Sequence, residues 1–333
     1  MFDFLLDIEV FRKSLAEQQA VIKDFWKKAG LVLSGSGVEL KPIPREWTAL
    51  GHNYFSVLFI AAFFHLGIPL PRLRLYARIN HCLRSWVTSC DNLLDNELKE
   101  MIKTDLPEGA TVFKSVHTIL VTDRAFFLFL FDALDDGVIS RDEMEKLLNV
   151  SLSAMTASGK EEAAEERGAD YSIRPEEVLY KIHANKTGRL FTSPLAAPMS
   201  LGDIGGERAE SIRKGLFHFG LGCQILDDLN DIGTDLSRSK YNYLAACVIH
   251  GKNREERDRL EGLMGLHRSD PDLYRLFPSA FDAVKKEMAG QFDTSLSLMK
   301  EGGMPFGRAV RTPFINALMV LFNRPEIMIR LRK

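Results

Sequence analysis

The chain has 333 residues, 46% of them hydrophobic, and a formal net charge of −2 at pH 7. A chain of this size and composition can bury a large core. Its nearly balanced charge gives no general attraction to nucleic acid or to an acidic membrane surface, so we expect neither as a partner. Its four cysteines show no CxxC spacing, and the N-terminus lacks the basic region of a signal peptide, so we expect reduced thiols in a cytoplasmic protein.

Helical periodicity runs through most of the chain, and strand patterns are nearly absent. The longest apolar run, residues 54–70, is interrupted by His65 and Gly67 and falls short of a membrane span. We therefore expect no transmembrane segment. The periodicity predicts helices at about 8–28, 46–67, 73–103, 112–134, 140–157, 175–197, 206–232, 240–250, 255–265, 278–300 and 306–322.

These segments predict an all-α fold, a single large helical bundle of about ten or more helices around a central cavity. We expect one domain over residues 1–333, with a core at about 50–250 that carries the motifs below and C-terminal helices at 251–333. The Phe-rich stretches 55–64 and 126–131 are candidates for an apolar pocket lining, although aromatic residues at helical spacing more often form plain core.

Three further segments favour ordinary structural roles. The charged stretch 159–172 is expected to be a solvated connector between helices. Residues 132–143 faintly resemble an EF-hand loop, but Leu134 stands where an oxygen ligand belongs, so we expect a helix connection. A solvated tail is likewise the favoured interpretation of the basic C-terminal residues Arg324, Arg330, Arg332 and Lys333.

An acidic pair lies in the predicted helix 73–103, in the sequence Cys90-Asp-Asn-Leu-Leu-Asp95. Asp91 and Asp95 are four residues apart, so a helix presents both carboxylates on one face. The surrounding residues are apolar. The pair is therefore a candidate for ligand binding as well as for a solvated helix face.

A denser acidic cluster occurs in the predicted helix 206–232. Asp227, Asp228 and Asp231 share one side of that helix, beside an apolar stripe formed by Leu221, Ile225, Leu229 and Ile232. Carboxylates packed this closely raise one another's pKa unless a cation neutralises them. Oxygen-only ligands suit Mg²⁺, which shares its remaining positions with water and substrate phosphates. We expect the two acidic clusters to face each other across a helical cavity.

Several segments, in this order, resemble motifs of the trans-isoprenyl diphosphate synthases, within the class I isoprenoid synthase superfamily. Asp91 to Asp95 resembles the first aspartate-rich motif, and His183-Ala-Asn-Lys-Thr-Gly-Arg-Leu190 resembles the Lys-Thr segment. Gly220-Leu-Gly-Cys-Gln-Ile-Leu-Asp-Asp-Leu-Asn-Asp231 resembles the glycine-glutamine segment that leads into the second aspartate-rich motif. Gly233-Thr-Asp-Leu-Ser-Arg-Ser-Lys240 resembles the stretch that follows, with a shortened loop.

The resemblance implies a magnesium-dependent enzyme of isoprenoid biosynthesis. In that family two acidic clusters bind three Mg²⁺ ions, which hold the diphosphate of an allylic prenyl substrate while pyrophosphate leaves and an allylic carbocation forms. Carried over to this chain, the resemblance assigns metal binding to Asp91, Asp95, Asp227 and Asp231, with Asp228 either a ligand or a support behind the ligands. It assigns diphosphate binding to Lys186 and Lys240, with Thr187 and Gln224 beside the diphosphate in supporting roles. We expect His183 to be a satisfied core histidine.

The chain departs from the family where the second substrate, isopentenyl diphosphate, is held. The counterpart of a Gly-Lys-x-x-Arg segment, residues 51–55, lacks both cations. An arginine pair after the first motif is also missing, and Lys99 and Lys103 cannot supply the bidentate fork of arginine. Asn92 stands where a second aspartate is usual. An ionisation site without a co-substrate site resembles that of a terpene cyclase.

Three hypotheses follow. The main one is a single-substrate enzyme of the terpene synthase type, which ionises one prenyl diphosphate. The second is a trans-prenyltransferase, an isoprenyl diphosphate synthase or a head-to-head condensing enzyme, with a divergent acceptor site that uses Lys99 and Lys103. The third is a non-catalytic partner subunit, against which the five retained aspartates argue. Because members of this fold often pair through helices, we expect a homodimer. Candidates for the floor of the substrate pocket are His81, Trp86 and Cys90.

Overall fold

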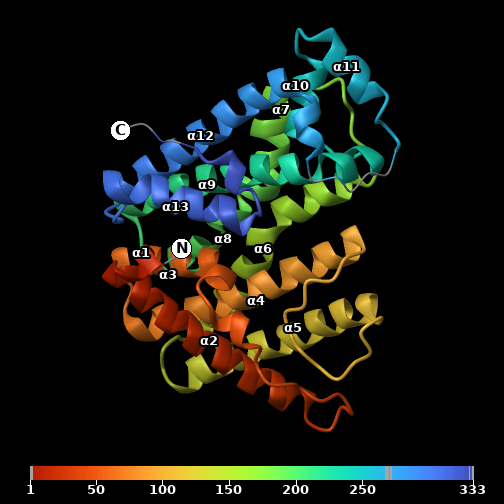
Figure 1. The fold of residues 1–333 in the computed structure, drawn as a ribbon. Coiled ribbons are helices and arrows are strands. Elements are labelled where there is room, and N and C mark those ends of the chain that lie inside the picture. Colours follow the sequence, from red (N-terminus) through yellow and green to blue (C-terminus); the bar gives the residue numbers. More distant parts are fainter. Residues whose placement is uncertain (1–2, 267–269, 271, 330, 332–333) are drawn as a thin grey trace. The chain divides into compact units, whose positions relative to one another are not determined.

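The computed structural model describes residues 3–266, 270, 272–329 and 331, and their regular elements are helices (Figure 1). The β-pairing within these residues is one isolated antiparallel bridge between Leu40 and Thr104. The predicted all-α fold class is therefore confirmed. No helix in this part of the chain is long and apolar enough to cross a membrane.

The chain folds into two compact units. Unit 1 comprises Met1–Ser151 and Ala197–Ile204, and unit 2 comprises Leu152–Ala196 and Gly205–Lys333. The helix α6 (Arg141–Glu165) begins in the first and ends in the second. The expectation that all of the chain forms one domain stays a prediction.

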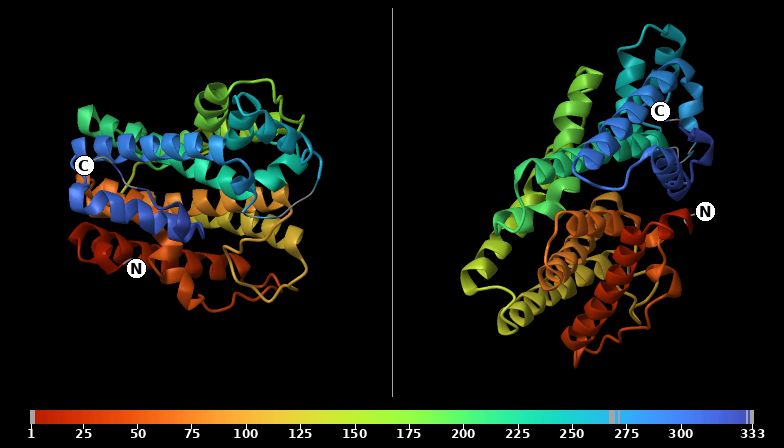
Figure 2. Two further views of the ribbon diagram at one scale, coloured as in Figure 1. Left: turned by 45° about the horizontal axis from the view of Figure 1, so that its top comes forward. Right: turned by 90° about the vertical axis from the view of Figure 1, so that its left-hand side faces the viewer.

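Unit 1 is built on two long helices that run side by side, α4 (Leu70–Asp95) and α5 (Thr111–Asp135), as Figures 1 and 2 show. Pro71 in the first turn suits the start of α4, because proline needs no backbone donor there. Asn96 caps the C-terminal end of the helix in a left-handed conformation, with a φ of 49°. The unit's other helices are α1 (Asp3–Leu6), α2 (Glu9–Leu33) and α3 (Tyr54–His65), with short 3₁₀ turns η1 (Arg45–Thr48) and η2 (Gly51–Asn53).

Unit 2 is built on α9 (Gly206–Ser237) and α12 (Pro278–Glu301), which also run side by side (Figure 2). Gly222 permits this close packing, because a Cβ atom there would lie 2.6 Å from the ring of Phe292. The other helices that lie wholly in the unit are α7 (Pro175–Glu177), α10 (Tyr243–Ile249), α11 (Arg254–Glu261) and α13 (Arg308–Leu321). A π-helix, η3 (Val178–Gly188), precedes the 3₁₀ turn η4 (Leu190–Thr192) and α8 (Ser193–Ser200).

The helix boundaries differ from the prediction in several places, and three of the differences lie in segments that carry candidate site residues or join them. The helix α4 ends at Asp95, eight residues before the predicted end, and α9 continues to Ser237. Half of the predicted connector 159–172 is helical, because α6 extends to Glu165. Its glutamates and alanines are good helix formers, which explains the extension.

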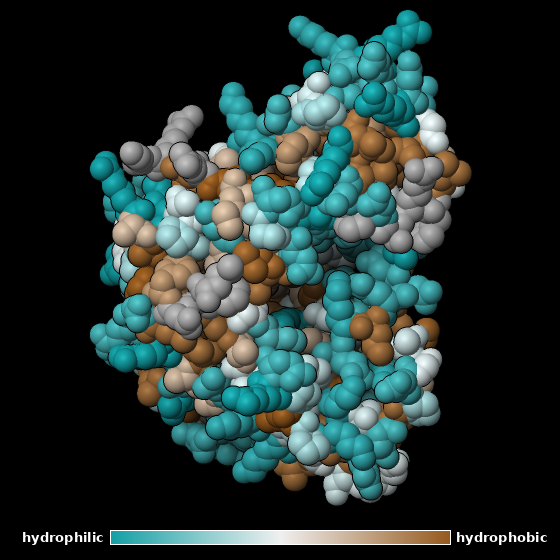
Figure 3. Space-filling model, viewed as in Figure 1, coloured by the Kyte–Doolittle hydropathy of each residue, from teal (hydrophilic) through white to brown (hydrophobic). Residues whose placement is uncertain are grey.

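The face of the molecule in Figure 3 is largely hydrophilic, with hydrophobic residues in separate groups.

Candidate functional site

The first acidic pair occupies the C-terminal end of α4, in unit 1. Asp91 and Asp95 are both partly exposed, whereas Asn92 between them is buried. The amide of Asn92 donates to the backbone oxygen of Lys99 at 3.1 Å and accepts from its backbone nitrogen at 2.9 Å. The asparagine that replaces the usual aspartate thus braces the turn after α4 from inside the protein.

The second acidic cluster lies on α9, in unit 2, and its three aspartates have different surroundings. Asp227 and Asp231 are exposed and four residues apart, so their carboxylates occupy the same face of the helix. Asp228 is only 2% exposed. One step along a helix turns the side chain by about 100°, which places Asp228 on the buried side. The expectation that all three aspartates share one side of the helix is therefore wrong for Asp228.

Three donors surround the Asp228 carboxylate. His183 Nε2 lies 2.7 Å from Oδ2, and the backbone N–H of Tyr243 donates to the same oxygen at 2.5 Å. Gln224 Nε2 donates to Oδ1 at 2.9 Å. His183 is 1% exposed, and its Nδ1 has no hydrogen-bond partner in the structure. The aspartate therefore ties η3, α9 and α10 together. His183 is buried, as expected of a core histidine, but only one of its two ring nitrogens is satisfied.

Close packing of η3 on α9 brings Thr187 and Gln224 together. The Thr187 hydroxyl donates to Gln224 Oε1. Gly220 makes this approach feasible, because a Cβ atom there would lie 2.8 Å from the backbone oxygen of Thr187 and 3.0 Å from the Cβ of Phe191. The hydrogen bonds continue from Thr187 through Gln224 to Asp228.

Asn242 joins the end of α9 to this network. Its side-chain nitrogen donates to the backbone oxygen of Asp228 and to Asp235 Oδ2, both at 2.8 Å. Burial and the charge of Asp228 raise the pKa of Asp235 well above its ordinary value. The last turns of α9 are thus fixed against the loop that carries Lys240.

Lys186 contacts α6, which the sequence did not predict. Its Nζ lies 2.8 Å from Glu162 Oε1 and 2.9 Å from Glu165 Oε2. Burial alone lowers the pKa of Lys186, but the charges of Glu165 and Glu162 outweigh that effect and raise it well above the ordinary value. The ammonium group is therefore charged at neutral pH.

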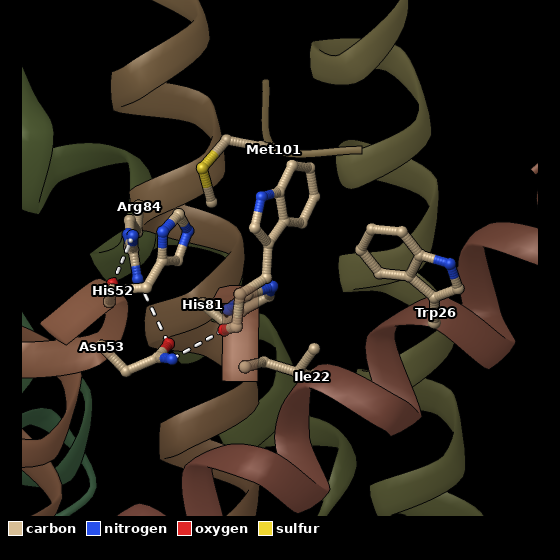
Figure 4. A pocket seen from close by; sticks show the side chains of 8 residues that line it. Ile22, Trp26, His52, Asn53, His81, Arg84 and Met101 are labelled. Carbon is tan, nitrogen blue, oxygen red and sulfur yellow. Dashed lines mark hydrogen bonds between the residues drawn. The ribbon is translucent and has the colours of Figure 1, made fainter. Parts of the chain in front are cut away.

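A small pocket in unit 1, with a mainly apolar lining, was also not predicted from the sequence (Figure 4). It lies between α4, α2 and η2, and none of its eight described lining residues is acidic. Arg84 donates to the backbone oxygen of His52 at 2.9 Å and reaches Asn53 Oδ1 at 3.5 Å. The other lining residues are Ile22, Trp26, Trp47, His81 and Met101.

Burial lowers the pKa of two basic groups in this pocket. Burial lowers the pKa of Arg84 to about 10. Burial, followed by the charge of Arg84, lowers the pKa of His81 to about 3. His81 is 5% exposed, and its Nε2 has no hydrogen-bond partner in the structure. The sequence did contain one signal that Arg84 could belong to the candidate site. Arg84 precedes Asp91 by seven residues, or about two helical turns, so both lie on one face of α4.

The remaining candidates occupy structural positions. Lys99 pairs with Glu97 at 2.6 Å, and Lys103 pairs with Glu100 at 2.5 Å. Arg324 is 5% exposed and pairs with Asp272 at 3.1 Å, so the expectation of a solvated tail is wrong for this residue. The other three basic residues for which we expected a solvated tail lie outside the described residues: Arg330, Arg332 and Lys333.

The loop after α5 is an ordinary helix connection, as expected. Ser140 and Glu143 form a capping box, in which Glu143 Oε2 accepts from the backbone N–H of Ser140 at 2.8 Å. Glu143 Oε1 also pairs with Arg72 at 2.6 Å. Within the described part of the chain, no three His, Cys, Asp or Glu side chains form a preformed metal site.

Comparison with known proteins gives one curated relative and many similar structures. No family model matches the chain. The farnesyl diphosphate synthase of Bacillus subtilis (strain 168) is 25% identical over 202 residues, which cover 53% of this chain and 68% of that protein.

Three solved structures illustrate the structural similarity. A decaprenyl diphosphate synthase from Rhodobacter capsulatus has a TM-score of 0.63 and 17% identity, and the match covers 94% of this chain and 98% of that one. A polyprenyl synthase from Caulobacter crescentus CB15, complexed with calcium and isoprenyl diphosphate, has a TM-score of 0.62 and 17% identity, with 96% and 97% covered. A geranylgeranyl pyrophosphate synthase from Corynebacterium glutamicum, complexed with isoprenyl diphosphate and magnesium, has a TM-score of 0.62 and 15% identity, with 94% and 99% covered.

The three structural matches extend over nearly the whole chain. The resemblance to the trans-isoprenyl diphosphate synthases is thereby confirmed, and the chain has the all-α fold of the isoprenoid synthases.

Proposed function

We propose that the protein is a magnesium-dependent isoprenoid synthase that ionises an allylic prenyl diphosphate with loss of pyrophosphate. The observation that carries this proposal is the pair of exposed carboxylates of Asp227 and Asp231 on α9, held in place by the buried Asp228. Their oxygen ligands suit Mg²⁺, which binds through one or two carboxylates together with water and substrate phosphates. The similarity of the fold to that of the isoprenyl diphosphate synthases supports the same function.

The ligands we propose are Asp91 and Asp95 on α4 and Asp227 and Asp231 on α9. Magnesium, when bound, supplies Lewis acidity to the leaving oxygens of the diphosphate. Lys186 and Lys240 place positive charge beside the diphosphate as its bond to the allylic carbon breaks and the electron pair moves to oxygen. Thr187 and Gln224 orient this part of the site through their hydrogen bond.

For the fate of the carbocation we propose transfer to a second prenyl unit rather than reaction of a single substrate. The similar proteins are prenyl diphosphate synthases, which favours the trans-prenyltransferase hypothesis over the terpene synthase hypothesis. Arg84 adds a second argument, because it supplies a cation beside residues 51–55, the segment in which the sequence has lost both cations. Arg84 and Asp91 lie roughly 10 Å apart along one face of α4, at 1.5 Å per residue.

Incubation with substrates tests this proposal. The purified protein and Mg²⁺ are mixed with geranyl, farnesyl or geranylgeranyl diphosphate, each with and without isopentenyl diphosphate, and pyrophosphate and extracted products are measured. We expect a longer prenyl diphosphate only when isopentenyl diphosphate is present. A hydrocarbon or alcohol formed without it would support the single-substrate hypothesis. No turnover in any mixture would contradict the proposed activity and favour the partner-subunit hypothesis.

A further inference from the structure

The end of α6 holds Lys186 through two glutamates that differ in their exposure. Glu162 and Glu165 are three residues apart, so both side chains lie on one face of the helix. The side chain of Glu162 is 18% exposed, like that of Lys186, whereas the side chain of Glu165 is 3% exposed. Two of the three donors of the ammonium group thus face carboxylates, and the three side chains together carry a charge of −1.

Glu165 also contacts the loop that carries Lys240, the second lysine that we assign to the diphosphate. While its Oε2 pairs with Lys186, its Oε1 accepts a long hydrogen bond of 3.4 Å from the backbone N–H of Tyr241. One buried carboxylate therefore links η3 to the loop that contains Lys240. Glu162 contacts Lys186 from the more exposed side.

The chain that follows α6 strengthens this connection. The backbone N–H of Ala169 donates to the backbone oxygen of Ser239 at 2.6 Å, and the Tyr171 hydroxyl donates to the backbone oxygen of Lys240 at 3.1 Å. The segment that we expected to be a solvated connector thus packs against the loop that contains Lys240. These hydrogen bonds all lie within unit 2.

We propose that Glu165 is a positioning residue for both lysines and that Glu162 is an internal counter-anion, which the substrate diphosphate displaces from Lys186. This inference rests on the proposed function. The more exposed carboxylate can turn towards solvent when a diphosphate arrives, whereas the buried one is retained by Lys186 and Tyr241. Before it moves, Glu162 repels the incoming diphosphate and competes with it for the same ammonium group.

The roles predict opposite effects for two isosteric substitutions. Glu162→Gln removes the competing charge, so the protein should bind diphosphate more tightly, by roughly three- to thirty-fold. Glu165→Gln weakens the link between the two lysine segments, so binding should be weaker by roughly ten-fold. Glu161→Gln is the matched control, because the carboxylate of Glu161 accepts its hydrogen bond from Asn185, at 2.9 Å; its affinity should match that of the wild type.

Isothermal titration of each protein with inorganic pyrophosphate in the presence of Mg²⁺ measures these affinities, and thermal unfolding shows whether each variant is folded. The KM for the prenyl diphosphate should fall for Glu162→Gln, an effect that damage to the structure does not produce. A folded Glu162→Gln protein with unchanged or weaker pyrophosphate binding would overturn the inference. Glu162→Ala also removes the negative charge and serves as a second variant for the same test. Absence of binding by the wild type itself would overturn the proposed function as well.

Discussion

His183 and Asp228 form a buried pair between η3 and α9, with Nε2 and Oδ2 2.7 Å apart and both side chains almost wholly shielded from solvent. The carboxylate accepts two further hydrogen bonds, from Gln224 and from the backbone of Tyr243. A charge so enclosed is stable only while its partners stay in place. The hydrogen bonds of this pair therefore fix the part of α9 that carries the second aspartate cluster.

This arrangement separates the roles of the three aspartates on α9. Asp228→Asn replaces an acceptor by a donor that faces the N–H of Tyr243, so it should lower the free energy of unfolding by about 2–3 kcal/mol. Asp227→Asn and Asp231→Asn alter exposed side chains and should affect stability much less, while abolishing pyrophosphate release. Chemical denaturation and a pyrophosphate assay measure the two properties. Full activity in the Asp227 and Asp231 variants would contradict the assignment of these residues to the metal.

The close approach of η3 to α9 depends on Gly220. A methyl group there meets the backbone oxygen of Thr187 and the Cβ of Phe191, so Gly220→Ala should lower the free energy of unfolding by about 1–3 kcal/mol. Gly290, inside α12, has nothing within 4 Å of the position of a Cβ atom. Gly290→Ala should therefore raise stability by about 0.5–1 kcal/mol. Urea unfolding of the two variants compares them directly, and equal effects would show that packing at Gly220 is not limiting.

The buried His81 should make the protein less stable in mild acid. Its pKa is about 3 in the folded state and near 6.5 in the unfolded state, so the unfolded state binds the additional proton between these values. The contribution of His81 is complete above pH 6.5 and is lost as the pH falls, by about 2 kcal/mol at pH 5. Denaturation at pH 7.5 and pH 5 should show a larger loss for the wild type than for His81→Asn. The same loss in both proteins would mean that His81 is protonated in the folded state.

Arg84 provides a test of the proposed acceptor site. Arg84→Met keeps an unbranched apolar stem but removes the charged guanidinium group, so the KM for isopentenyl diphosphate should rise by at least about ten-fold. Binding of the allylic diphosphate should change little. Arg124→Gln on the exposed side of α5 serves as the control. A Michaelis–Menten analysis that gives the same KM for wild type and Arg84→Met would remove the argument for an acceptor site in this pocket.

An exposed apolar stripe on α5 is the surface on which we expect the homodimer to form. Its large side chains follow helical spacing and leave one face of the helix uncovered: Val112, Phe113, Val116, Leu120, Phe127 and Phe131. Leu120→Lys combined with Phe127→Lys should convert a dimer into monomers in analytical ultracentrifugation. Leu31→Lys, at an exposed leucine on α2, should leave the dimer intact. A wild-type protein that sediments as a monomer would contradict the expectation.

The sequence predicted features that depend on local spacing. Most helices and the shared face of Asp227 and Asp231 follow from helical periodicity. Burial of Asp228 was also accessible, because it lies three residues after Ile225 and four before Ile232, on the apolar stripe.

Contacts between segments far apart in the chain could not be derived in the same way. Lys186 meets Glu165 across 21 positions, and Arg84 meets His52 across 32. Each contact depends on how helices pack, which periodicity does not specify. The helix-forming composition of 159–165 did carry a signal, but high charge favoured the interpretation as a connector.

The uninterrupted course of α9 has a further consequence for how such a site can change. Asp227, Asp231 and Asp235 follow one another every four residues, so the helical rise spaces them by about 6 Å along the axis. The regular helix fixes the distances between these aspartates, whereas Lys240 lies beyond the end of α9, in the loop that follows. Substitutions in the loop can therefore shift the cation and tune the fit to different diphosphates, while the spacing of the acidic groups is inherited unchanged.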